Sequence, residues 1–306
     1  MSAKSLLDVG GTEVAVSNLD KVLYPKTGFT KGQVIDYYVR ISSVLLPHLE
    51  GRPITLKRYP DGVEGFFFYE KKCPAHRPKW VKTAKVPKTE GGEIPYCVMD
   101  SLPSLVWAAN LADLELHTFL HRAPAIQRPT ALAFDLDPGA PADILDCCVV
   151  GLMVRDLFAA LGLQSFPKTS GSKGLQVYVP LNTAAATYET TKPFAHAVAE
   201  QLEKRSPRLV VSRMQKTLRK GRVLVDWSQN DEKKTTITVY SLRARERPTV
   251  STPVSWTEVE RAVKGKCPLS FDTEQVLARV KKYGDLFAPV LSLRQKLPRP
   301  AALERL

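Results

Sequence analysis

The sequence predicts an α/β protein of the α+β type, with a mixed or antiparallel sheet flanked by helices and an N-terminal α/β module packed against it. Some segments carry hydrophobic residues at helical intervals, and others carry alternating or continuous hydrophobic runs of about four to eight residues, the length of a strand. Gly, Pro and Asp separate these segments, and no internal repeat or low-complexity tract interrupts them. With 306 residues, of which 44% are hydrophobic, the chain can bury one large core or two smaller ones side by side.

The N-terminal module is expected to cover residues 1 to about 125 of a single domain that spans residues 1–306. A capping-box spacing at Thr30–Gln33 precedes hydrophobic residues at helical intervals, which predicts a helix that packs on a sheet. A turn signal at Pro60–Gly62 predicts a hairpin between its two flanking segments. The elements expected here are a strand at Glu13–Val16, the helix from Thr30 to about Leu45, hairpin strands at Ile54–Arg58 and Gly65–Tyr69, a Pro- and Lys-rich loop, a helix at Leu102–Leu111 and a strand at Leu114–Phe119.

The second module is expected to cover residues 126 to about 295, with a tail or linker at 296–306. Strands and helices follow one another closely here, and the Pro-containing tail is typical of a terminus or the start of a linker. The expected strands are Leu132–Asp137, Gly174–Pro180, Arg208–Val211, Val223–Asp226 and Thr236–Leu242, and the expected helices are Ala142–Leu161, Pro193–Lys204, Glu258–Val263 and Thr273–Tyr283.

The cysteine content argues against both a disulfide framework and a four-cysteine zinc site. The five cysteines are an odd number, and none of them forms a C-x-x-C pair. Cys73, His76 and Cys97 could in principle hold zinc, but buried, reduced thiols are the favoured interpretation.

No segment of the sequence predicts an association with membranes. No hydrophobic run approaches the roughly 20 residues that a helix needs to cross a bilayer. Met1–Gly10 also lacks the basic-then-apolar pattern of a signal peptide. We therefore expect a soluble, cytoplasmic protein.

Positive charge is concentrated in two segments of the chain. The formal net charge is +13, while residues 71–88 carry seven Lys or Arg and residues 204–225 carry eight, with no Asp or Glu in either segment. The rest of the chain is therefore close to neutral. A single segment of this kind is usually an ordinary solvated face. Two of them favour a polyanionic partner such as a nucleic acid.

Three aspartates occur at the ends of predicted strands. Strand alternation places Asp135 and Asp137 on the face opposite Leu132, Phe134 and Leu136, and two carboxylates so close on one face repel each other unless a cation lies between them. Asp before Pro-Gly is also ordinary turn chemistry. This pair alone therefore supports a turn and a Mg²⁺ or Mn²⁺ site equally well.

The third acid, Asp226, ends a hydrophobic strand directly after the second basic segment. It could simply pair with Arg219 or Arg222. Three carboxylates at strand ends are, however, what two metal ions need when they bridge an attacking hydroxyl and a triphosphate.

A Ser- and Gly-rich segment, KTSGSKG, lies between these acids. Its glycines allow backbone N–H groups to approach an anion, while Ser170 and Ser172 donate hydrogen bonds and Lys173 adds charge. It lacks the G-x-x-x-x-G-K pattern of a Walker A loop. A flexible turn into a strand is an equally good interpretation of these residues alone.

The motifs FDLDPG, TSGSKGLQVYVP and VLVDWSQN, in this order, resemble those of the archaeo-eukaryotic primase superfamily. The resemblance is strongest to the polymerase domain of bacterial ligase D, which serves non-homologous end joining, and it runs from SNLDKVLYP through LELH to VYSLRAR and STPVSW. It implies a primase-polymerase fold and a DNA- or RNA-synthesising nucleotidyltransferase that extends a primer 3′-hydroxyl on a template by two-metal catalysis. Its DNA substrates would be short gaps and double-strand-break ends that carry a 5′-phosphate.

The resemblance also assigns roles to individual residues. Asp135, Asp137 and Asp226 would be the catalytic metal ligands. Lys21 and Lys31 match lysines that grip the 5′-phosphate, and Phe67 and Phe68 match an aromatic pair that stacks on template bases. Positions that contact the nucleotide are matched by Lys57, His117, Ser170, Ser172, Lys173, Gln176, Arg219, Gln229 and Arg243.

Each of these residues also has a plainer explanation. A lone lysine is usually a surface residue, and the phenylalanines could belong to the core. His117 could be hydrogen-bonded to a neighbour, and Arg243 and Arg245 could pair with Glu246 or Asp231 at the surface.

The resemblance further implies two Mn²⁺ or Mg²⁺ ions as cofactors and nucleoside triphosphates of either sugar as substrates. Its implied partners are the end-binding protein Ku and a DNA ligase, and its implied location is the cytoplasm, at the bacterial nucleoid during repair. The K-x-D-G nucleophile motif of a ligase does not occur in the sequence. We therefore expect a polymerase alone, either free-standing or cut from a longer ligase.

One residue departs from the family pattern. Gln176 stands where the family usually has His, at a position expected to face the triphosphate, and Gln can donate a hydrogen bond but cannot carry charge. A DNA-end-binding module whose polymerase site has decayed is therefore an alternative. A phosphatase of the haloacid dehalogenase type is disfavoured, because Gly139 stands where those enzymes carry Thr or Val.

Overall fold

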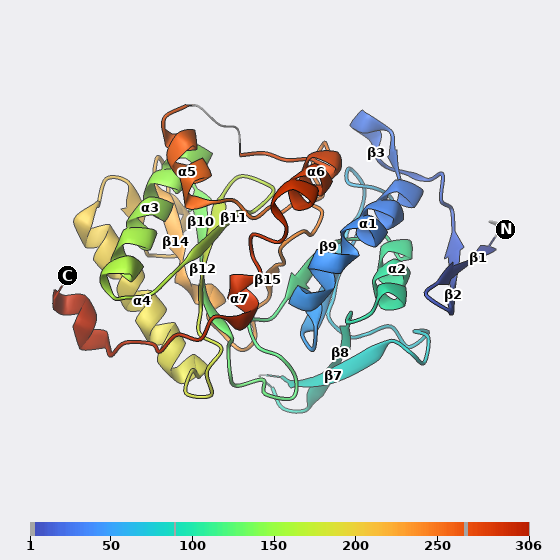
Figure 1. The fold of residues 1–306 in the computed structure, drawn as a ribbon, viewed down its shortest axis with the longest axis horizontal. Helices are drawn as coiled ribbons and strands as arrows, with labels where there is room; N and C mark the ends of the chain where they lie inside the picture. The colour runs from blue at the N-terminus through green and yellow to red at the C-terminus, as the bar shows by residue number, and fades with distance from the viewer. Residues whose placement is uncertain (1–3, 89, 266–268, 306) are drawn as a thin grey trace. The chain divides into compact units, whose positions relative to one another are not determined.

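The computed structural model describes residues 4–88, 90–265 and 269–305, which form two compact units (Figure 1). Unit 1 contains the described residues up to Pro124, together with Thr235–Ser251 and Phe271–Gly284. Unit 2 contains Ala125–Lys234, the described residues of 252–270, and the chain from Asp285 onward. Each unit has its own sheet, so each is described separately.

A five-stranded mixed sheet organises unit 2. Its order is β11-β12-β10-β14-β13, and every neighbouring pair is antiparallel except β13 and β14. Strand β10 is therefore central and carries two of the three aspartates. The strands are β10 Ala131–Pro138, β11 Phe166–Thr169, β12 Leu175–Pro180, β13 Val210–Val211 and β14 Val223–Asp226.

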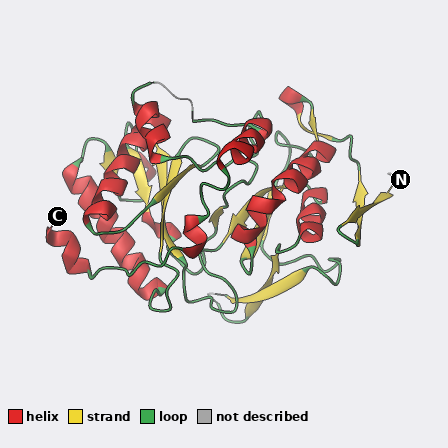
Figure 2. Ribbon diagram, in the orientation of Figure 1, coloured by secondary structure: helices red, strands yellow, loops and turns green. Residues whose placement is uncertain are grey.

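Helices cover the hydrophobic face of β10. Helix α3 (Ile144–Ala160) packs on β10 and β12, and α4 (Tyr188–Arg205) packs on β10 and β13 (Figure 2). Phe134 contacts Phe158 of α3, which contacts Phe194 of α4, with ring centroids 5.6 and 6.4 Å apart. Leu132, Phe134 and Leu136 are fully buried on this face. The predicted alternation is thus confirmed, and the aspartates lie on the other face. Unit 2 is completed by α5 Trp256–Val263, α7 Pro289–Ser292 and the short 3₁₀ helices η2 Lys216–Leu218, η3 Trp227–Gln229 and η4 Pro300–Arg305.

A second sheet organises unit 1. Its order is β15-β9-β5-β8-β7, and β6 pairs with β5 as the hairpin predicted across Pro60–Gly62. Two small hairpins, β1-β2 and β3-β4, precede the sheet in the chain. The strands are β1 Lys4–Val9, β2 Thr12–Ser17, β3 Val22–Tyr24, β4 Phe29–Thr30, β5 Pro53–Arg58, β6 Phe68–Glu70, β7 Lys82–Pro87, β8 Glu93–Val98, β9 Asp113–Thr118 and β15 Thr236–Ile237.

Helix α1 (Lys31–Leu49) connects the early and late segments of unit 1. Thr30 and Gln33 form the predicted capping box at its start. The hydroxyl of Tyr38 donates to the carbonyl oxygen of Leu114 at 2.8 Å, and that of Tyr37 donates to the carbonyl oxygen of Tyr240, also at 2.8 Å. Helix α1 also contacts α2 (Leu102–Asn110) and α6 (Thr273–Tyr283). Through these two buried hydrogen bonds, α1 holds β9 and the segment that contains Tyr240 in place.

Several predicted boundaries were wrong. The strand predicted at Thr236–Leu242 is only β15, because the chain turns at Tyr240, whose φ is +64°. Helix α4 begins at Tyr188 rather than Pro193, because Thr187 and Thr190 form a capping box there, and Pro193 lies within the helix. The Pro- and Lys-rich loop contains β7, whose pairing with β8 was not predicted, since its side chains are mostly polar.

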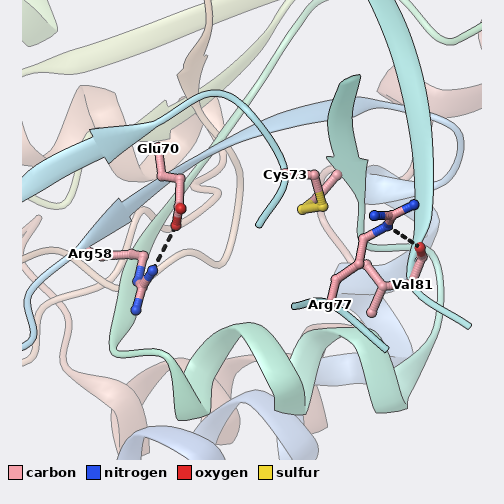
Figure 3. Close-up of a disulfide and its surroundings, with 6 residues drawn as sticks. Arg58, Glu70, Cys73, Arg77 and Val81 are labelled. Atoms are coloured by element: carbon pink, nitrogen blue, oxygen red, sulfur yellow. Dashed lines mark hydrogen bonds and ion pairs between the residues drawn. A yellow bond between two sulfur atoms is a disulfide. The ribbon is translucent and has the colours of Figure 1, made fainter. Parts of the chain in front are cut away.

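The expectation of reduced thiols at Cys73 and Cys97 was also wrong, because the two residues form a disulfide with a Cα–Cα distance of 4.9 Å (Figure 3). This bond joins the start of the basic segment to β8 and excludes these sulfurs as zinc ligands. Cys147 and Cys148 are free and buried, as expected for thiols in a core. In the described part of the chain, no helix is long and apolar enough to cross a membrane.

The disulfide should contribute measurably to stability. It closes a loop over a sequence separation of 24 residues, and loop-closure entropy predicts a contribution of about 3 kcal/mol to the free energy of unfolding. Urea unfolding with and without a phosphine reductant should show this difference. The double variant Cys73→Ser/Cys97→Ser is the control, because its stability should not respond to the reductant. Equal stability of the wild type in both conditions would contradict the disulfide.

Candidate active site

The aspartates of unit 2 come together through strand register. Asp135 of β10 lies directly opposite Asp226 of β14, and residues so paired in adjacent antiparallel strands have neighbouring side chains. Asp137 lies two residues further along β10, opposite Leu224. Asp135 and Asp226 are partly buried, whereas Asp137 is exposed. The register therefore gathers the three predicted acids at one end of the sheet.

Two glycines allow this end of the sheet to form. A Cβ atom on Gly139 would collide with the carbonyl oxygen of Arg219, and one on Gly174 would collide with that of Leu136. The N–H of Gly139 donates to the carbonyl oxygen of Arg222 at 2.8 Å. Gly139 and Gly174 thus lie so close to neighbouring backbone that no residue with a side chain fits at either position.

Both carboxylate oxygens of Asp226 accept hydrogen bonds from residues just after it. Oδ1 accepts from the backbone N–H and hydroxyl of Ser228 at 2.9 and 2.6 Å, and Oδ2 accepts from the side-chain amide of Gln229 at 3.0 Å. The ammonium group of Lys234 in turn donates to the Ser228 hydroxyl. Gln229, a predicted nucleotide contact, therefore touches the third acid. Ser228 and Lys234 were not predicted, because only the fold of η3 and the turn after it reveals them.

Asp135 is poorly compensated for a carboxylate in its position. Burial, together with the charge of Asp226, raises its pKa to about 6, against a hydrogen bond from Gln176 and the charge of Lys168. A nearby cation would lower this pKa, because opposite charge favours the ionised form. Within the described residues, no three His, Cys, Asp or Glu side chains converge as a ready-made metal site. The donor set is nevertheless all carboxylate oxygen, which suits Mg²⁺ or Mn²⁺.

Gln176 lies beside Asp135 on β12 and is buried. Its Oε1 accepts a hydrogen bond of 2.5 Å from the ammonium group of Lys168 on β11, which is fully buried. Because the amide oxygen faces Lys168, the amide NH₂ is the group available to Asp135. Gln176 therefore connects a buried cation to a buried carboxylate without carrying charge.

The SGSKG loop is organised by Ser170. The Ser170 hydroxyl accepts from the backbone N–H groups of Ser172 and Gly174 at 3.2 and 3.1 Å. The side chains of Ser172 and Lys173 are exposed. Arg219 lies 3.5 Å from a carboxylate oxygen of Asp137, rather than beside Asp226. Gln176, Arg219 and Gln229 therefore lie beside the acids, whereas Ser170 is turned into its own loop.

A second cluster of predicted residues lies in unit 1 around Glu115 of β9. Lys57, His117 and Arg243 each approach its carboxylate, with N–O distances of 3.2, 3.0 and 3.3 Å. Glu115 is 2% exposed, and despite burial these groups hold its pKa well below its usual range. Burial lowers the pKa of His117, although Glu115 opposes that shift. Sequence reasoning missed Glu115 as the centre of the cluster, although it stands two residues before His117 in the predicted strand and so shares a face with it.

Aromatic rings cover Lys57. Its ammonium group lies 4.8 to 5.3 Å from the ring centroids of Tyr59, Phe67 and Tyr69, and Phe67 stacks on Tyr59. Phe68 lies beneath the Arg58 guanidinium and stacks with Phe66. The most exposed of these rings are Phe66 and Tyr69, at 68% and 55%. Neither was predicted, and both offer more free surface for stacking than Phe68.

The two predicted phosphate-binding lysines are neighbours in unit 1. The backbone N–H of Lys31 donates to the carbonyl oxygen of Lys21, and the ammonium group of Lys31 donates to that of Asn110 at 3.1 Å. Lys31 is buried, and burial together with the charge of Lys21 lowers its pKa. Lys21 is exposed and lies 3.2 Å from Asp61. Two adjacent cations with so little compensation favour an anion between them.

Removal of Glu115 should strongly destabilise the protein. Glu115→Ala leaves the cations around it without their buried counter-charge, a change that costs about 3 to 5 kcal/mol. Urea unfolding at pH 7 measures this loss. Glu274→Ala is the matched control, because it removes an exposed pair with Arg40 that is worth less than about 1 kcal/mol. Similar losses for the two variants would show that Glu115 is not the centre of this cluster.

The raised pKa of Asp135 predicts a pH dependence of stability in the absence of metal. As the pH falls from 8 to 5, the folded protein binds a proton at Asp135 near pH 6, whereas in the unfolded chain this carboxyl stays ionised until about pH 4. The fold should therefore gain about 1 kcal/mol over this range relative to Asp135→Asn, which cannot titrate. Unfolding of both proteins in a chelating buffer tests this. Parallel pH profiles would contradict the raised pKa.

The chain is similar to known proteins over most of its length. Residues 30–287 match the family described as LigD, primase-polymerase domain. The chain is 43% identical over 279 residues to the multifunctional non-homologous end joining protein LigD of Mycolicibacterium smegmatis, and 32% identical over 290 residues to the bifunctional LigD of Bacillus subtilis. These matches cover 90% and 95% of this chain but only 36% and 46% of the two relatives.

A solved structure is similar over nearly its full length. It is the polymerase domain from Mycobacterium tuberculosis ligase D in complex with DNA, at 40% identity and a TM-score of 0.86, and the match covers 92% of this chain and 99% of that one. The predicted α/β architecture and the predicted resemblance are both confirmed. The chain belongs to the LigD primase-polymerase family.

Proposed function

We propose that this chain is a template-directed nucleotidyltransferase that extends primer 3′-hydroxyls at short gaps or broken DNA ends during non-homologous end joining. The observation that carries the proposal is the pair Asp135 and Asp226, opposite each other in adjacent strands, with the pKa of Asp135 raised to about 6. A sheet that places two acids together with so little compensating positive charge is suited to hold divalent cations.

In this proposal Asp135, Asp137 and Asp226 hold two Mn²⁺ or Mg²⁺ ions. Such ions would lower the pKa of the primer hydroxyl and stabilise charge on the transferred phosphoryl group. A metal ion held by Asp226 would compete with the Ser228 and Gln229 donors for its carboxylate oxygens. A donor displaced in this way would be available to the nucleotide, which agrees with the role that the resemblance gives to Gln229.

The proposal also gives the cations of unit 1 the nucleotide contacts that the resemblance assigns to them. Lys57 and Arg243 are held by Glu115 and present their remaining N–H groups to a triphosphate, while His117 stays neutral because burial lowers its pKa. A neutral imidazole can still hydrogen-bond to a sugar hydroxyl. Lys21 and Lys31 would take the 5′-phosphate, and exposed aromatic rings would stack on template bases.

The proposed partners follow from the family. The relatives are whole LigD proteins of which this chain spans 36% to 46% of the length. We propose that a DNA ligase and the end-binding protein Ku act with this chain, in the cytoplasm where the bacterial chromosome lies.

A second candidate function is a DNA-end-binding module without polymerase activity. Its support is that Gln176 is tied to Lys168 and that Asp226 is fully hydrogen-bonded within η3. Extension of a primer across a 5′-phosphorylated gap with Mn²⁺, run beside a binding assay on the same DNA, separates the two functions. Tight binding without any incorporation by the wild type would favour the module.

Asp226→Ala should abolish extension. Loss of this carboxylate removes a ligand of the proposed metal pair, so the extension rate should fall at least about a hundredfold. Binding to gapped DNA, measured by fluorescence anisotropy, should change little, because the proposed phosphate and base contacts lie elsewhere.

Asp156→Ala is the control for this variant. Asp156 is an exposed acid on α3 that pairs with Arg155, and its removal should leave extension unchanged. Undiminished extension by Asp226→Ala would refute the proposed function.

A further inference from the structure

Unit 1 contains a cavity of about 430 Å³ that none of the family-matched residues lines. It lies between β2, the C-terminal end of α2 and the segment that follows the disulfide. Its volume falls within the range of about 300 to 1,000 Å³ typical of ligand pockets, at the small end. The cavity therefore suits a single planar group rather than a long segment.

Aromatic side chains form much of the cavity lining. Trp107 of α2 lines the cavity and is 6% exposed, and the ring of exposed His76 lies 6.5 Å from it. Trp80 is half-buried and lines the same cavity, next to Pro78. Three aromatic rings in the lining of one cavity offer a nucleobase surfaces for stacking.

The disulfide and local hydrogen bonds fix the segment that carries His76, Pro78 and Trp80. Cys73 is bonded to Cys97, and its backbone N–H donates to the carbonyl oxygen of Pro95 at 2.7 Å. Arg77 Nε donates to the carbonyl oxygen of Val81 at 3.3 Å, as Figure 3 shows. The cavity is thus formed in advance, so a ligand does not have to order it on binding.

Two exposed lysines belong to the segment that lines the cavity or directly precede it in the sequence. No described carboxylate lies within ion-pair distance of Lys72 or Lys79, in contrast to Lys82, which pairs with Asp100. Lys79 stands between Pro78 and Trp80, which both line the cavity. Glu13 is the one acid among the lining residues. Cations beside aromatic rings are typical of sites for single-stranded nucleic acid.

One residue connects this cavity to the proposed 5′-phosphate site. Asn110 lines the cavity, and its carbonyl oxygen accepts the hydrogen bond from the ammonium group of Lys31. Its side chain holds β2, because Oδ1 accepts from the N–H of Ser17 and Nδ2 donates to the carbonyl oxygen of Ala15. Asn110 would therefore be the residue that separates a phosphate at Lys31 from the cavity.

We propose that this cavity binds one unpaired nucleobase of the DNA strand whose 5′-phosphate is held by Lys21 and Lys31, while Lys72 and Lys79 contact its backbone. This inference rests on the proposed function, since it assumes a DNA substrate with a 5′-phosphate. A DNA end with a frayed terminal pair would be held by its loose base as well as by its phosphate. Two exposed lysines so near in sequence to the lining residues favour DNA over a peptide of a protein partner as the occupant.

Two gapped DNA duplexes test the proposal. They differ only at the base pair that carries the 5′-phosphate, which is matched in one and mismatched in the other, with 2-aminopurine as the mismatched base. The wild type should bind the mismatched DNA more tightly and quench the 2-aminopurine fluorescence, because the base stacks in the cavity. Trp80→Ala should lose about tenfold in affinity for the mismatched DNA only, together with the quenching.

Two further variants control for misfolding and for non-specific effects. Lys79→Glu changes an exposed side chain, so it should fold normally and still weaken binding of the mismatched DNA more than that of the matched DNA. Tyr283→Ala is the matched control, because Tyr283 is a 50% exposed ring that also has a lysine, Lys282, 4.9 Å from its centroid, and it does not line this cavity. It should change neither affinity nor fluorescence.

The outcomes distinguish this inference from the proposed function. If the wild type extends a primer on the matched DNA but Trp80→Ala and Lys79→Glu bind both DNAs like the wild type, the cavity proposal is overturned and the polymerase proposal stands. If no DNA is extended but the quenching depends on Trp80, the polymerase proposal fails and the cavity proposal stands. Loss of binding to a Ku or ligase polypeptide in Trp80→Ala, with DNA binding unchanged, would assign the cavity to a protein and overturn the proposal.

Discussion

A carboxylate placed inside a sheet must be neutralised, and the two sheets of this protein meet that requirement in opposite ways. In unit 1, Glu115 is surrounded by Lys57, His117 and Arg243, so its pKa stays far below the usual range despite burial. In unit 2, Asp135 faces another acid and its pKa rises to about 6. The charge of the first carboxylate is compensated by side chains of the protein. The second is left with a deficit of positive charge, which is where a cation from solution has most to contribute.

Lys168 and Gln176 set the size of that deficit. A buried ammonium group that paired directly with Asp135 would neutralise the charge of this acid. Instead Gln176 stands between the two groups and accepts from Lys168 at 2.5 Å. An uncharged amide transmits part of the effect of the cation through oriented hydrogen bonds. The residue that departs from the family pattern thus keeps the site organised in the absence of other charges.

Local patterns were enough to predict the elements that carry the acids. Continuous or alternating hydrophobic residues define β10 and β14, and a capping box defines the start of α1. Strands that depend on pairing were not predictable. Strand β7 is mostly polar and forms because it pairs along its whole length with β8.

The candidate site shows the same division between local and long-range information. The aspartates were identified from strand ends and from the resemblance. Glu115 as a centre was not, because Lys57 and Arg243 reach it from distant parts of the sequence. The disulfide was missed for a related reason, since an odd cysteine count says nothing of which two residues the fold brings together.

The order in which the units are assembled from the chain has a consequence for synthesis. Unit 1 needs Thr235–Ser251 and Phe271–Gly284, which follow all of Ala125–Lys234 in the sequence. On the ribosome, the sheet of unit 1 therefore stays incomplete while the first part of unit 2 is synthesised. During this time β9 lacks its neighbour β15, and Tyr37 lacks the carbonyl oxygen of Tyr240. Neither unit can complete its fold before nearly all of the other has been synthesised. The two units should therefore fold together, late in translation. A fragment that ends near residue 125 would expose that unfinished edge.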